Sequence, residues 1–365
     1  MRLLLCGGGT AGHISPALAV AEEVKKSCKD AKILFIGRFG GQENNIIEKN
    51  GYELQTIKIS GLRRSLSFDN VKRVITAIKA KSEAERIIKE FKPDVILGTG
   101  GYVCWPVISA GKKLKIPTAI HESNSSAGLT TKILARKCDK LFLNHKETKK
   151  ELKTKNNIMV VGNPIKQEFY KTSRRSARAK YNLSDSDFFI LSFGGSIGAE
   201  ELNKAVISVM ENLSSKDKSV KHLHAVGHRY FKNLDSKFTK KETDGCRIVP
   251  YIDDMPTALA ASDLVICRCG AMTLSEISAV GVAAILIPSP NVSDNHQYKN
   301  AKLLCDRAAA TMIEEKNLSA EHLKNDIISL KNDKNVRKSL AKNIKQFSTP
   351  LAASNISKEL FLLKK

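Results

Sequence analysis

The sequence predicts an α/β protein built from two doubly wound parallel-sheet domains that face each other. Three observations lead to this prediction. The chain has 365 residues, which exceeds the usual size of a single core and favours two domains of roughly 150–200 residues. Short apolar runs alternate with helical stretches along the whole chain, and the order of motifs in the first half returns in the second.

Apolar runs of strand length recur from one end of the chain to the other. In the first half the predicted strands are Arg2–Cys6, Lys32–Ile36, Glu53–Ile57, Val95–Leu97, Thr118–His121, Lys140–Leu143 and Met159–Val161. In the second half they are Phe189–Phe193, Lys221–Val226, Cys246–Val249, Leu264–Cys267, Ala284–Ile287 and Ala310–Ile313. Because helices of ten or more residues separate most of these runs, we predict right-handed crossovers and parallel sheets.

The two halves of the chain repeat one plan. The segment Leu3–Gly12 is echoed by Ile190–Ala199, and each reads as a strand, a glycine turn and the start of a helix. Later in each half, Pro93–Gly101 is echoed by Ser262–Gly270. Two halves with the same order of motifs imply two domains of the same doubly wound type.

The turn tripeptide Gly162-Asn163-Pro164 ends the first series of strands and marks the domain boundary. The predicted domains are therefore residues 1–162 and residues 163–349. Residues 350–365 carry Ile356, Leu360 and Leu363 at helical spacing, which predicts a terminal helix that docks on the domains.

A formal charge of +23 favours a polyanionic partner: nucleic acid, anionic lipid or a phosphorylated substrate. The lysines are spread over the whole chain, however, and a lysine-rich proteome would produce the same excess without a binding role.

The chain offers no sign of secretion or of a spanning segment. Too few apolar residues precede Gly7 for a signal peptide, and no uncharged run approaches the ~20 residues that a spanning helix needs. We therefore expect a cytosolic protein whose membrane contact is peripheral. The eight cysteines are scattered without a Cys-x-x-Cys pair, so we expect reduced thiols and no metal site.

The first glycine loop, Gly7 to Gly12, places backbone amides and a helix N-terminus where an anion would bind. It does not fit the dinucleotide pattern Gly-x-Gly-x-x-Gly well, and a tight structural turn is the alternative. His13 follows directly and is a candidate for accepting the proton of an attacking hydroxyl. A histidine held by backbone groups at a helix start is the other interpretation.

The second domain carries the more informative motifs. Ser196 lies in a glycine turn before a helix, and Arg268–Glu276 joins a strand to a helix. In that geometry the amides of Ala271 to Thr273 would hold a diphosphate while Glu276 accepts the two hydroxyls of a ribose. A glutamate favoured only by the helix dipole is the alternative. Further on, the polar segment Ser293–Asn300 follows a strand, where a sugar would lie.

On these residues the sequence resembles the MurG family of glycosyltransferases, and the match covers nearly the whole chain. In the first half the motifs are Gly8-Gly9-Thr10-Ala11-Gly12-His13, Gly98-Thr99-Gly100-Gly101-Tyr102, His121-Glu122-Ser123-Asn124, Ala127-Gly128-Leu129-Thr130 and Gly162-Asn163-Pro164-Ile165. In the second half they are Gly194-Gly195-Ser196, Gly198-Ala199, Tyr251-Ile252-Asp253-Asp254-Met255, Arg268–Glu276, His296-Gln297 and Asn300-Ala301.

The resemblance implies a GT-B fold, in which two Rossmann-like domains face a deep cleft. It also implies an inverting transfer of N-acetylglucosamine from UDP-N-acetylglucosamine to the 4-hydroxyl of the MurNAc-peptide of lipid I. Lipid I is the undecaprenyl-pyrophosphate-linked acceptor, and the product is lipid II of peptidoglycan synthesis, which serves cell shape and division. No metal or other cofactor is expected, because Asp253-Asp254 belongs to the uracil-loop motif and more plausibly caps a helix.

The resemblance assigns residues one by one. The catalytic candidates are His13, as the base, and Glu122. Ile252 would contact the uracil through its backbone, the segment from Ala271 to Ser275 would surround the diphosphate, and Glu276 would bind the ribose. The full set of expected substrate-binding residues is Thr10, Ala11, Gly12, Asn124, Lys166, Ser196, Ile252, Arg268, Ala271, Met272, Thr273, Leu274, Ser275, Glu276, His296, Gln297 and Asn300.

Three positions depart from the family pattern. Lys166 replaces a common arginine and loses its planar fork, Ile197 replaces a glutamine, and Cys269 replaces a serine. None of these changes removes a group that the mechanism requires, although the phosphate contact at 166 is weakened.

Since the acceptor is anchored in the inner leaflet, the resemblance implies a peripheral enzyme at the cytoplasmic face of the cell membrane. We expect the first domain to meet an anionic surface through Arg63, Arg64, Lys72, Arg73, Val74, Ile75, Ile78, Lys79, Lys81 and an exposed Trp105. An amphipathic helix that packs inward is the alternative interpretation of this segment.

Three other functions fit parts of the sequence. A related lipid glycosyltransferase that uses another UDP-sugar has the same fold, and a noncatalytic protein that binds a nucleotide sugar would keep the same loops. A nucleic-acid binder would explain the charge, but no basic-aromatic module is present and the glycine loops would have no role, so no nucleic-acid partner is expected.

Overall fold

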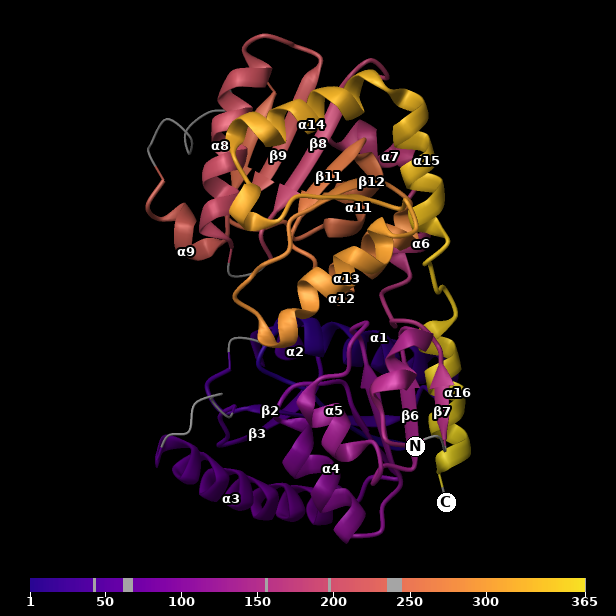
Figure 1. Cartoon of the computed structure of the whole chain (residues 1–365). Helices are drawn as coiled ribbons and strands as arrows, with labels where there is room; N and C mark the ends of the chain where they lie inside the picture. The colour runs from indigo at the N-terminus through magenta and orange to yellow at the C-terminus, as the bar shows by residue number, and fades with distance from the viewer. Residues whose placement is uncertain (42–43, 62–67, 155–156, 196–197, 235–244, 365) are drawn as a thin grey trace. The chain divides into compact units, whose positions relative to one another are not determined.

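The computed structural model describes residues 1–41, 44–61, 68–154, 157–195, 198–234 and 245–364 (Figure 1). The chain forms two compact units. Unit 1 comprises Met1–Ile165 together with Thr349–Lys365, and unit 2 comprises Lys166–Ser348.

Unit 1 is built on a parallel sheet of seven strands in the order β3-β2-β1-β4-β5-β6-β7. The strands are β1 (Arg2–Cys6), β2 (Lys32–Arg38), β3 (Glu53–Ile57), β4 (Val95–Gly98), β5 (Thr118–Glu122), β6 (Lys140–Leu143) and β7 (Ile158–Val160). The helices are α1 (Ala11–Ser27), α2 (Asn44–Lys49), α3 (Phe68–Phe91), α4 (Cys104–Lys113), α5 (Leu129–Leu134), the short η1 (Lys146–Glu151) and α16 (Ala352–Leu363).

The central strand of unit 1 is apolar on both faces because helices cover both. Leu3, Leu4 and Leu5 are fully buried, and burial of each such side chain contributes about 1.5–3 kcal/mol. Leu4 belongs to the core formed with α3, α4 and α5, whereas Leu3 and Leu5 belong to the core formed with α1 and α16. A continuous apolar run is therefore what this position in a parallel sheet requires.

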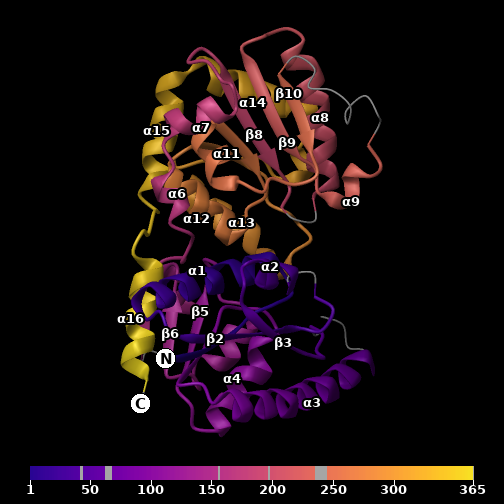
Figure 2. The ribbon, with the colours of Figure 1, turned by 180° about the vertical axis from the view of Figure 1, so that it is seen from behind.

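The C-terminal helix α16 belongs to unit 1, although it follows unit 2 in the sequence. Ile356 and Leu360 are fully buried in the core beside α1, and α1 and α16 lie side by side (Figure 2). Glu359 forms an ion pair with Lys140 (2.7 Å).

The long helix α3 leaves two apolar side chains in water. Ile75 is 51% exposed and Ile78 is 60% exposed, and Lys79 beside them is also exposed. The predicted exposure of Trp105 is wrong: because α4 packs against α3, its indole is half-buried against the core. Arg63 and Arg64, and the side chains of Lys72, Arg73 and Val74, lie outside what the structure describes.

Unit 2 is built on a parallel sheet in the order β10-β9-β8-β11-β12-β13. Its strands are β8 (Phe188–Phe193), β9 (Val220–Ala225), β10 (Cys246–Val249), β11 (Leu264–Cys267), β12 (Ala283–Leu286) and β13 (Thr311–Met312). Its helices are α6 (Glu168–Lys171), α7 (Arg174–Lys180), α8 (Glu200–Ser214), α9 (His228–Phe231), α11 (Met255–Ala261), α12 (Ala271–Val280), α13 (His296–Cys305), α14 (Ala320–Asn332) and α15 (Lys334–Lys345), with the short η2 (Ser293–Asn295) and η3 (Glu315–Asn317).

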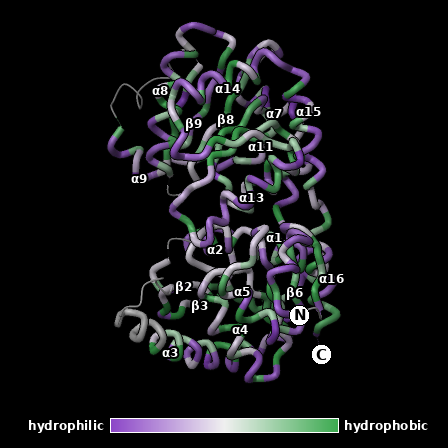
Figure 3. Tube along the Cα trace, in the orientation of Figure 1, coloured by the Kyte–Doolittle hydropathy of each residue, from purple (hydrophilic) through white to green (hydrophobic). Residues whose placement is uncertain are grey.

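Local signals begin and end the helices of unit 2. Ser173, Asp254, Ser319 and Asp333 accept amide hydrogen bonds at the first turns of α7, α11, α14 and α15, as N-cap side chains do. Gly281 ends α12 in the left-handed conformation (φ 77°), which glycine adopts without strain. Apolar residues concentrate along the central strand β8 (Figure 3), whose six residues are all buried.

The two sheets share one strand order, so β8, β9, β10, β11 and β12 correspond to β1, β2, β3, β4 and β5. The predicted α/β class with two doubly wound parallel sheets is therefore confirmed. In each sheet the order reverses between the first and fourth strands, and ligands of such folds bind at the carboxyl ends of those strands. Within the described residues, no helix is both long and apolar enough to cross a bilayer.

Candidate active site

His13 is the third residue of α1, directly after the glycine turn that follows β1. Its Nδ1 lies 2.9 Å from the carbonyl oxygen of Gly8 and 3.3 Å from the hydroxyl of Thr10. A carbonyl oxygen only accepts, so this contact assigns the ring proton to Nδ1 in the neutral histidine. Nε2 is then the nitrogen that carries the lone pair.

The turn after β4 packs against the turn after β1 and is hydrogen-bonded to it. The hydroxyl of Thr99 donates to the carbonyl oxygens of His13 (2.6 Å) and Cys6 (3.2 Å). A Cβ on Gly100 would lie 2.6 Å from Cδ2 of His13, and one on Gly101 would lie 2.0 Å from the Gly8 oxygen. Both glycines have positive φ (114° and 79°). These two glycines therefore form the wall against which the His13 ring rests.

The sequence analysis predicted no site role for Gly100 and Gly101, although both belong to the motif Gly98–Tyr102. The available signal was a pair of adjacent glycines at the end of a strand predicted to lie beside the first one.

His121 and Glu122 end β5 and are both buried. Nε2 of His121 donates to the carbonyl oxygen of Gly162 (3.0 Å), and burial lowers the pKa of this ring to about 4. His121 is therefore neutral at physiological pH.

Glu122 is surrounded by donors. One carboxylate oxygen accepts from the amide (3.1 Å) and side chain (3.0 Å) of Asn124. The other accepts from the amide of Gly128 (3.0 Å) and the hydroxyl of Thr131 (2.6 Å). Four hydrogen bonds occupy both oxygens, fix the loop into α5 and orient Asn124.

In unit 2 the corresponding junction is that from β11 to α12. The helix begins at Ala271, and its first internal hydrogen bond runs from the Leu274 amide to the Gly270 oxygen (3.0 Å). Amides before that bond point out of the helix start. The side chains of Met272 and Leu274 are buried, so a ligand at this helix start would reach only their backbone, and the Leu274 amide is already bonded to Gly270. The hydroxyl of Ser275 donates to the Ala271 oxygen (3.1 Å).

Glu276 lies in the second turn of α12 and makes no hydrogen bond or ion pair with any other described residue. Desolvation without a compensating cation raises the pKa of its carboxyl to about 8. The carboxyl is partly exposed beside a helix start, where its oxygens are open to a ligand hydroxyl.

Helix α13 holds the loop that precedes α12. Oε1 of Gln297 accepts from the amides of Cys269 (3.1 Å) and Ser289 (2.9 Å). Nδ2 of the buried Asn300 donates to the Cys269 oxygen (3.3 Å). Gln297 and Asn300 therefore clamp the backbone of Cys269, and the side-chain NH2 group of Gln297 is its remaining donor.

Arg268 is buried and bound within the protein. Its guanidinium donates to the carbonyl oxygens of Ile287 (3.2 Å) and Pro288 (3.3 Å) and pairs with Glu315. The charge of Arg268 is thus balanced by a residue almost fifty positions away, and no sequence pattern indicated this partner.

The remaining predicted residues lie on several different elements of the two units. Ile252 is buried after β10, and Asp254 caps α11 through the Thr257 amide (3.2 Å), as the sequence analysis expected. Nδ1 of His296 donates to the Ser293 oxygen (2.6 Å). Thr10 is exposed, Gly12 is partly exposed and Lys166 begins unit 2. Ser196 and the side chain of Ala11 lie outside the part of the chain that the structure describes.

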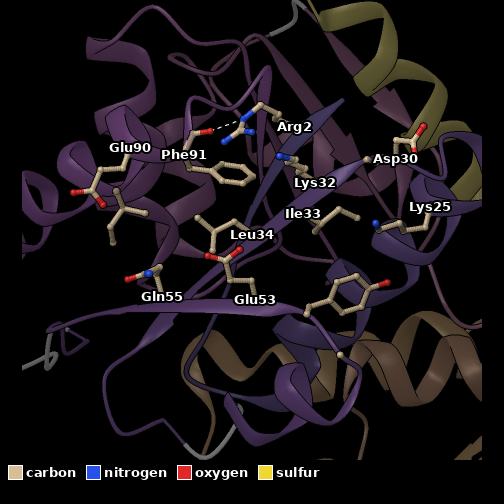
Figure 4. A pocket seen from close by; sticks show the side chains of 14 residues that line it. Arg2, Lys25, Asp30, Lys32, Ile33, Leu34, Glu53, Gln55, Glu90 and Phe91 are labelled. Carbon is tan, nitrogen blue, oxygen red and sulfur yellow. Dashed lines mark hydrogen bonds between the residues drawn. The ribbon is translucent and has the colours of Figure 1, made fainter.

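A hollow of about 620 Å³ lies at the opposite edge of the sheet of unit 1 (Figure 4). Residues from the amino ends of β1, β2 and β3 line it, among them Arg2, Lys32 and Glu53. Nε of Arg2 donates to the Phe91 oxygen there (2.6 Å). None of the predicted site residues lines this hollow, so we do not assign the reaction to it.

Two family models match the chain. The glycosyltransferase family 28 N-terminal domain matches residues 3–143, and the glycosyltransferase family 28 C-terminal domain matches residues 189–356.

Relatives of known name match over nearly the full length. The UDP-N-acetylglucosamine--N-acetylmuramyl-(pentapeptide) pyrophosphoryl-undecaprenol N-acetylglucosamine transferase of Acetivibrio thermocellus is 40% identical over 98% of this chain and 96% of its own. The protein of the same name from Bacillus cytotoxicus is 41% identical over 98% and 97%.

Solved structures agree with these relatives. The crystal structure of Acinetobacter baumannii MurG matches with a TM-score of 0.75 and 26% identity over 99% of both chains. The S. aureus MnaA–UDP structure matches with a TM-score of 0.70 over 99% and 96%, but at 12% identity this likeness shows the fold alone.

Proposed function

The chain belongs to the MurG family of glycosyltransferases, and from this premise we propose that it transfers N-acetylglucosamine from UDP-N-acetylglucosamine to lipid I, which gives lipid II in peptidoglycan synthesis. The observation that carries the assignment to a site is the β11–α12 junction. A helix start and the carboxyl of Glu276, which accepts no hydrogen bond from a described residue, lie there at the switch point of a doubly wound sheet.

The donor is proposed to bind unit 2 through this junction. The first amides of α12 would hold the diphosphate, and Glu276 would accept the ribose hydroxyls. Gln297 and Asn300 keep the backbone of Cys269 in place, and the NH2 group of Gln297 is available to the phosphate or sugar. Arg268 is proposed to fix the strand end rather than the ligand, because both terminal nitrogens of its guanidinium already donate to protein oxygens.

The general base is proposed to be His13 rather than Glu122. Neutral His13 keeps its proton on Nδ1, facing Gly8, so Nε2 is suited to receive the acceptor's proton. Glu122 is instead proposed to position Asn124 and α5, because its two oxygens already accept four hydrogen bonds.

The proposed reaction is a single displacement. The 4-hydroxyl oxygen of the acceptor attacks the anomeric carbon, the bond from that carbon to the phosphate oxygen breaks, and the hydroxyl proton passes to Nε2 of His13. Negative charge grows on the departing UDP, and amides at the helix start stabilise this charge more in the transition state than in the ground state.

The test is the release of UDP from UDP-N-acetylglucosamine, measured with and without a lipid-linked muramyl peptide. Acceptor-dependent release together with a disaccharide product is expected. A protein that binds the nucleotide sugar but releases no UDP in the presence of acceptor is a noncatalytic binder, and that result rejects the proposal. Equal release with a different lipid acceptor would indicate the related lipid glycosyltransferase instead.

We further propose that the enzyme is peripheral at the cytoplasmic face of the membrane and that α3 contacts an anionic surface. The support is the exposed pair Ile75 and Ile78, one helical turn apart, with the exposed Lys79 beside them. Apolar side chains with neighbouring cations are the composition that favours an anionic lipid interface.

A further inference from the structure

A buried polar cluster lies in unit 2 beneath the proposed donor side. Ser192 of β8 and His222 and His224 of β9 are 2% exposed or less. The Ser192 hydroxyl lies 2.7 Å from Nε2 of His222 and 2.8 Å from Nδ1 of His224. Nδ1 of His224 also lies 3.2 Å from the Ser192 carbonyl oxygen. We call these three residues the Ser192–histidine cluster.

The contacts fix where each proton sits. The Ser192 carbonyl oxygen only accepts, so Nδ1 of His224 carries a proton and donates to it and to the hydroxyl. The Ser192 hydroxyl then donates to His222, whose Nε2 must be unprotonated. One order of donors, His224 to Ser192 to His222, satisfies every contact in the cluster.

This order requires the His222 ring to be neutral, and the surroundings of His224 keep that ring neutral as well. Nε2 of His224 is buried without a hydrogen-bond partner. Burial in this state costs less free energy if Nε2 carries a lone pair than if it carries a proton, because an N–H group needs an acceptor. Burial lowers the pKa of both histidines, to about 4 for His224. Apolar side chains of similar volume would fill the same space without the free-energy cost of burying polar groups. We therefore infer that the cluster has a role beyond packing.

The cluster ties together the two strand ends on which α8 begins. Ser192 is one residue from the end of β8, which leads into the glycine turn at Gly194. His224 is one residue from the end of β9. Two residues after His224, the carbonyl of Val226 accepts from the side chain of Asn203 in the first turn of α8 (3.0 Å).

Gly198, just before α8, rests on the same carbonyl. A Cβ added there would lie 2.1 Å from the Val226 oxygen. Gly198 and Asn203 therefore take their position from the end of β9, and a shift of that end would move the start of α8.

We propose that the Ser192–histidine cluster consists of positioning residues for the donor: it holds the ends of β8 and β9 in register and so places the start of α8 beside the β11–α12 junction that is proposed to hold the UDP diphosphate, because Phe193 at the end of β8 pairs with Cys267 at the end of β11. The proposal rests on the proposed function, because it concerns the donor site assigned there. The cluster touches no substrate and acts through Val226, Gly198 and Asn203.

The test compares two variants of one residue. His224→Leu removes the donor to Ser192, whereas His224→Asn keeps an amide N–H near the position of Nδ1. The initial rates give kcat and the KM of each substrate, and thermal unfolding gives stability. We expect H224L to raise the KM for UDP-N-acetylglucosamine at least about tenfold, with kcat and the acceptor KM within about twofold. H224N should restore the donor KM to within about threefold.

The matched control is Ile327→Ala, which removes a fully buried side chain of α14 from the same core. If it lowers the unfolding temperature as much as H224L but leaves the donor KM unchanged, general destabilisation is excluded. Should H224L fail to fold, Ser192→Ala keeps both rings and tests the same link.

Three results would overturn the proposal: a folded H224L or S192A with a normal donor KM, an equal rise in I327A, or an equal rise in the KM of donor and acceptor. Failure of the proposed function is a separate outcome, since the wild-type protein would then release no UDP from UDP-N-acetylglucosamine when acceptor is added.

Discussion

At the scale of single residues, the reaction depends on which nitrogen of His13 holds the proton. The Gly8 carbonyl settles this by occupying Nδ1. His13→Ala should lower kcat by about a hundredfold or more, because general-base catalysis contributes that much, while UDP binding to unit 2 remains normal. Rate measurements at saturating substrate, with calorimetry of UDP binding as the control, check this. A near-normal kcat would remove His13 from the mechanism.

Glu276 makes a second prediction at this scale, for the free protein. Its carboxyl pKa is raised from 4.5 to about 8, so the folded state holds this proton where the unfolded chain releases it. Its contribution to stability is complete below pH 4.5 and is lost as the pH rises towards about 8. Glu276→Gln should therefore be more stable than the wild type above pH 8, by up to about 5 kcal/mol, and the two should converge below pH 4.5.

At pH 9, where the wild-type carboxyl is ionised, the same variant should bind UDP at least about tenfold more weakly, because an amide offers one acceptor oxygen where the carboxylate offers two to the ribose. Chemical denaturation across pH 4–9 measures the stability, and calorimetry measures the binding. A variant that is less stable at pH 9, or that keeps full UDP affinity, would contradict this account of Glu276.

At the scale of elements, the turns after β1 and β4 depend on each other. Gly101→Ala should destabilise unit 1 by at least about 2 kcal/mol and lower kcat, since a Cβ would meet the Gly8 oxygen. Gly51→Ala is the matched control: its φ is 75° but its Cβ would meet nothing within 4 Å. The difference between the two unfolding free energies isolates the contact, and equal losses would show that only the backbone angle matters.

The sequence predicted the strands well because their apolar runs are set by burial. Interior strands such as Leu264–Cys267 match their predicted ends. The edge strand predicted at Ala310–Ile313 is only Thr311–Met312, because it pairs with β12 alone and little fixes its ends.

The site could be predicted only in part. The junction carrying Glu276 follows from local order, since a strand, a glycine and a helix start are adjacent in sequence. Arg268 pairs with Glu315, and the amide of Cys269 donates to Gln297. No local sequence rule connects positions so far apart in the chain. The packing of Gly101 on Gly8 likewise depends on two strands that are neighbours only in the folded sheet.

At the scale of the whole molecule, the charge of +23 is compatible with an anionic membrane partner but does not locate it. We place the proposed membrane contact at the exposed pair on α3, Ile75 and Ile78. Ile75→Glu with Ile78→Glu should reduce co-sedimentation with vesicles rich in anionic lipid at least about fivefold, through lost apolar burial and added repulsion. Leu362→Glu, at a leucine of α16 that is 77% exposed, is the control. Binding that ignores anionic lipid content would contradict the membrane contact.

The central claim is that amides at strand-to-helix junctions, with Glu276, bind the pyrophosphate and ribose of an activated sugar. Calorimetric titration of the folded wild-type chain with UDP and with UDP-N-acetylglucosamine tests it most directly. The account predicts saturable binding of both ligands at one site per chain, weakened by Glu276→Gln. A folded protein that gives neither heat nor a thermal shift with either ligand would contradict it.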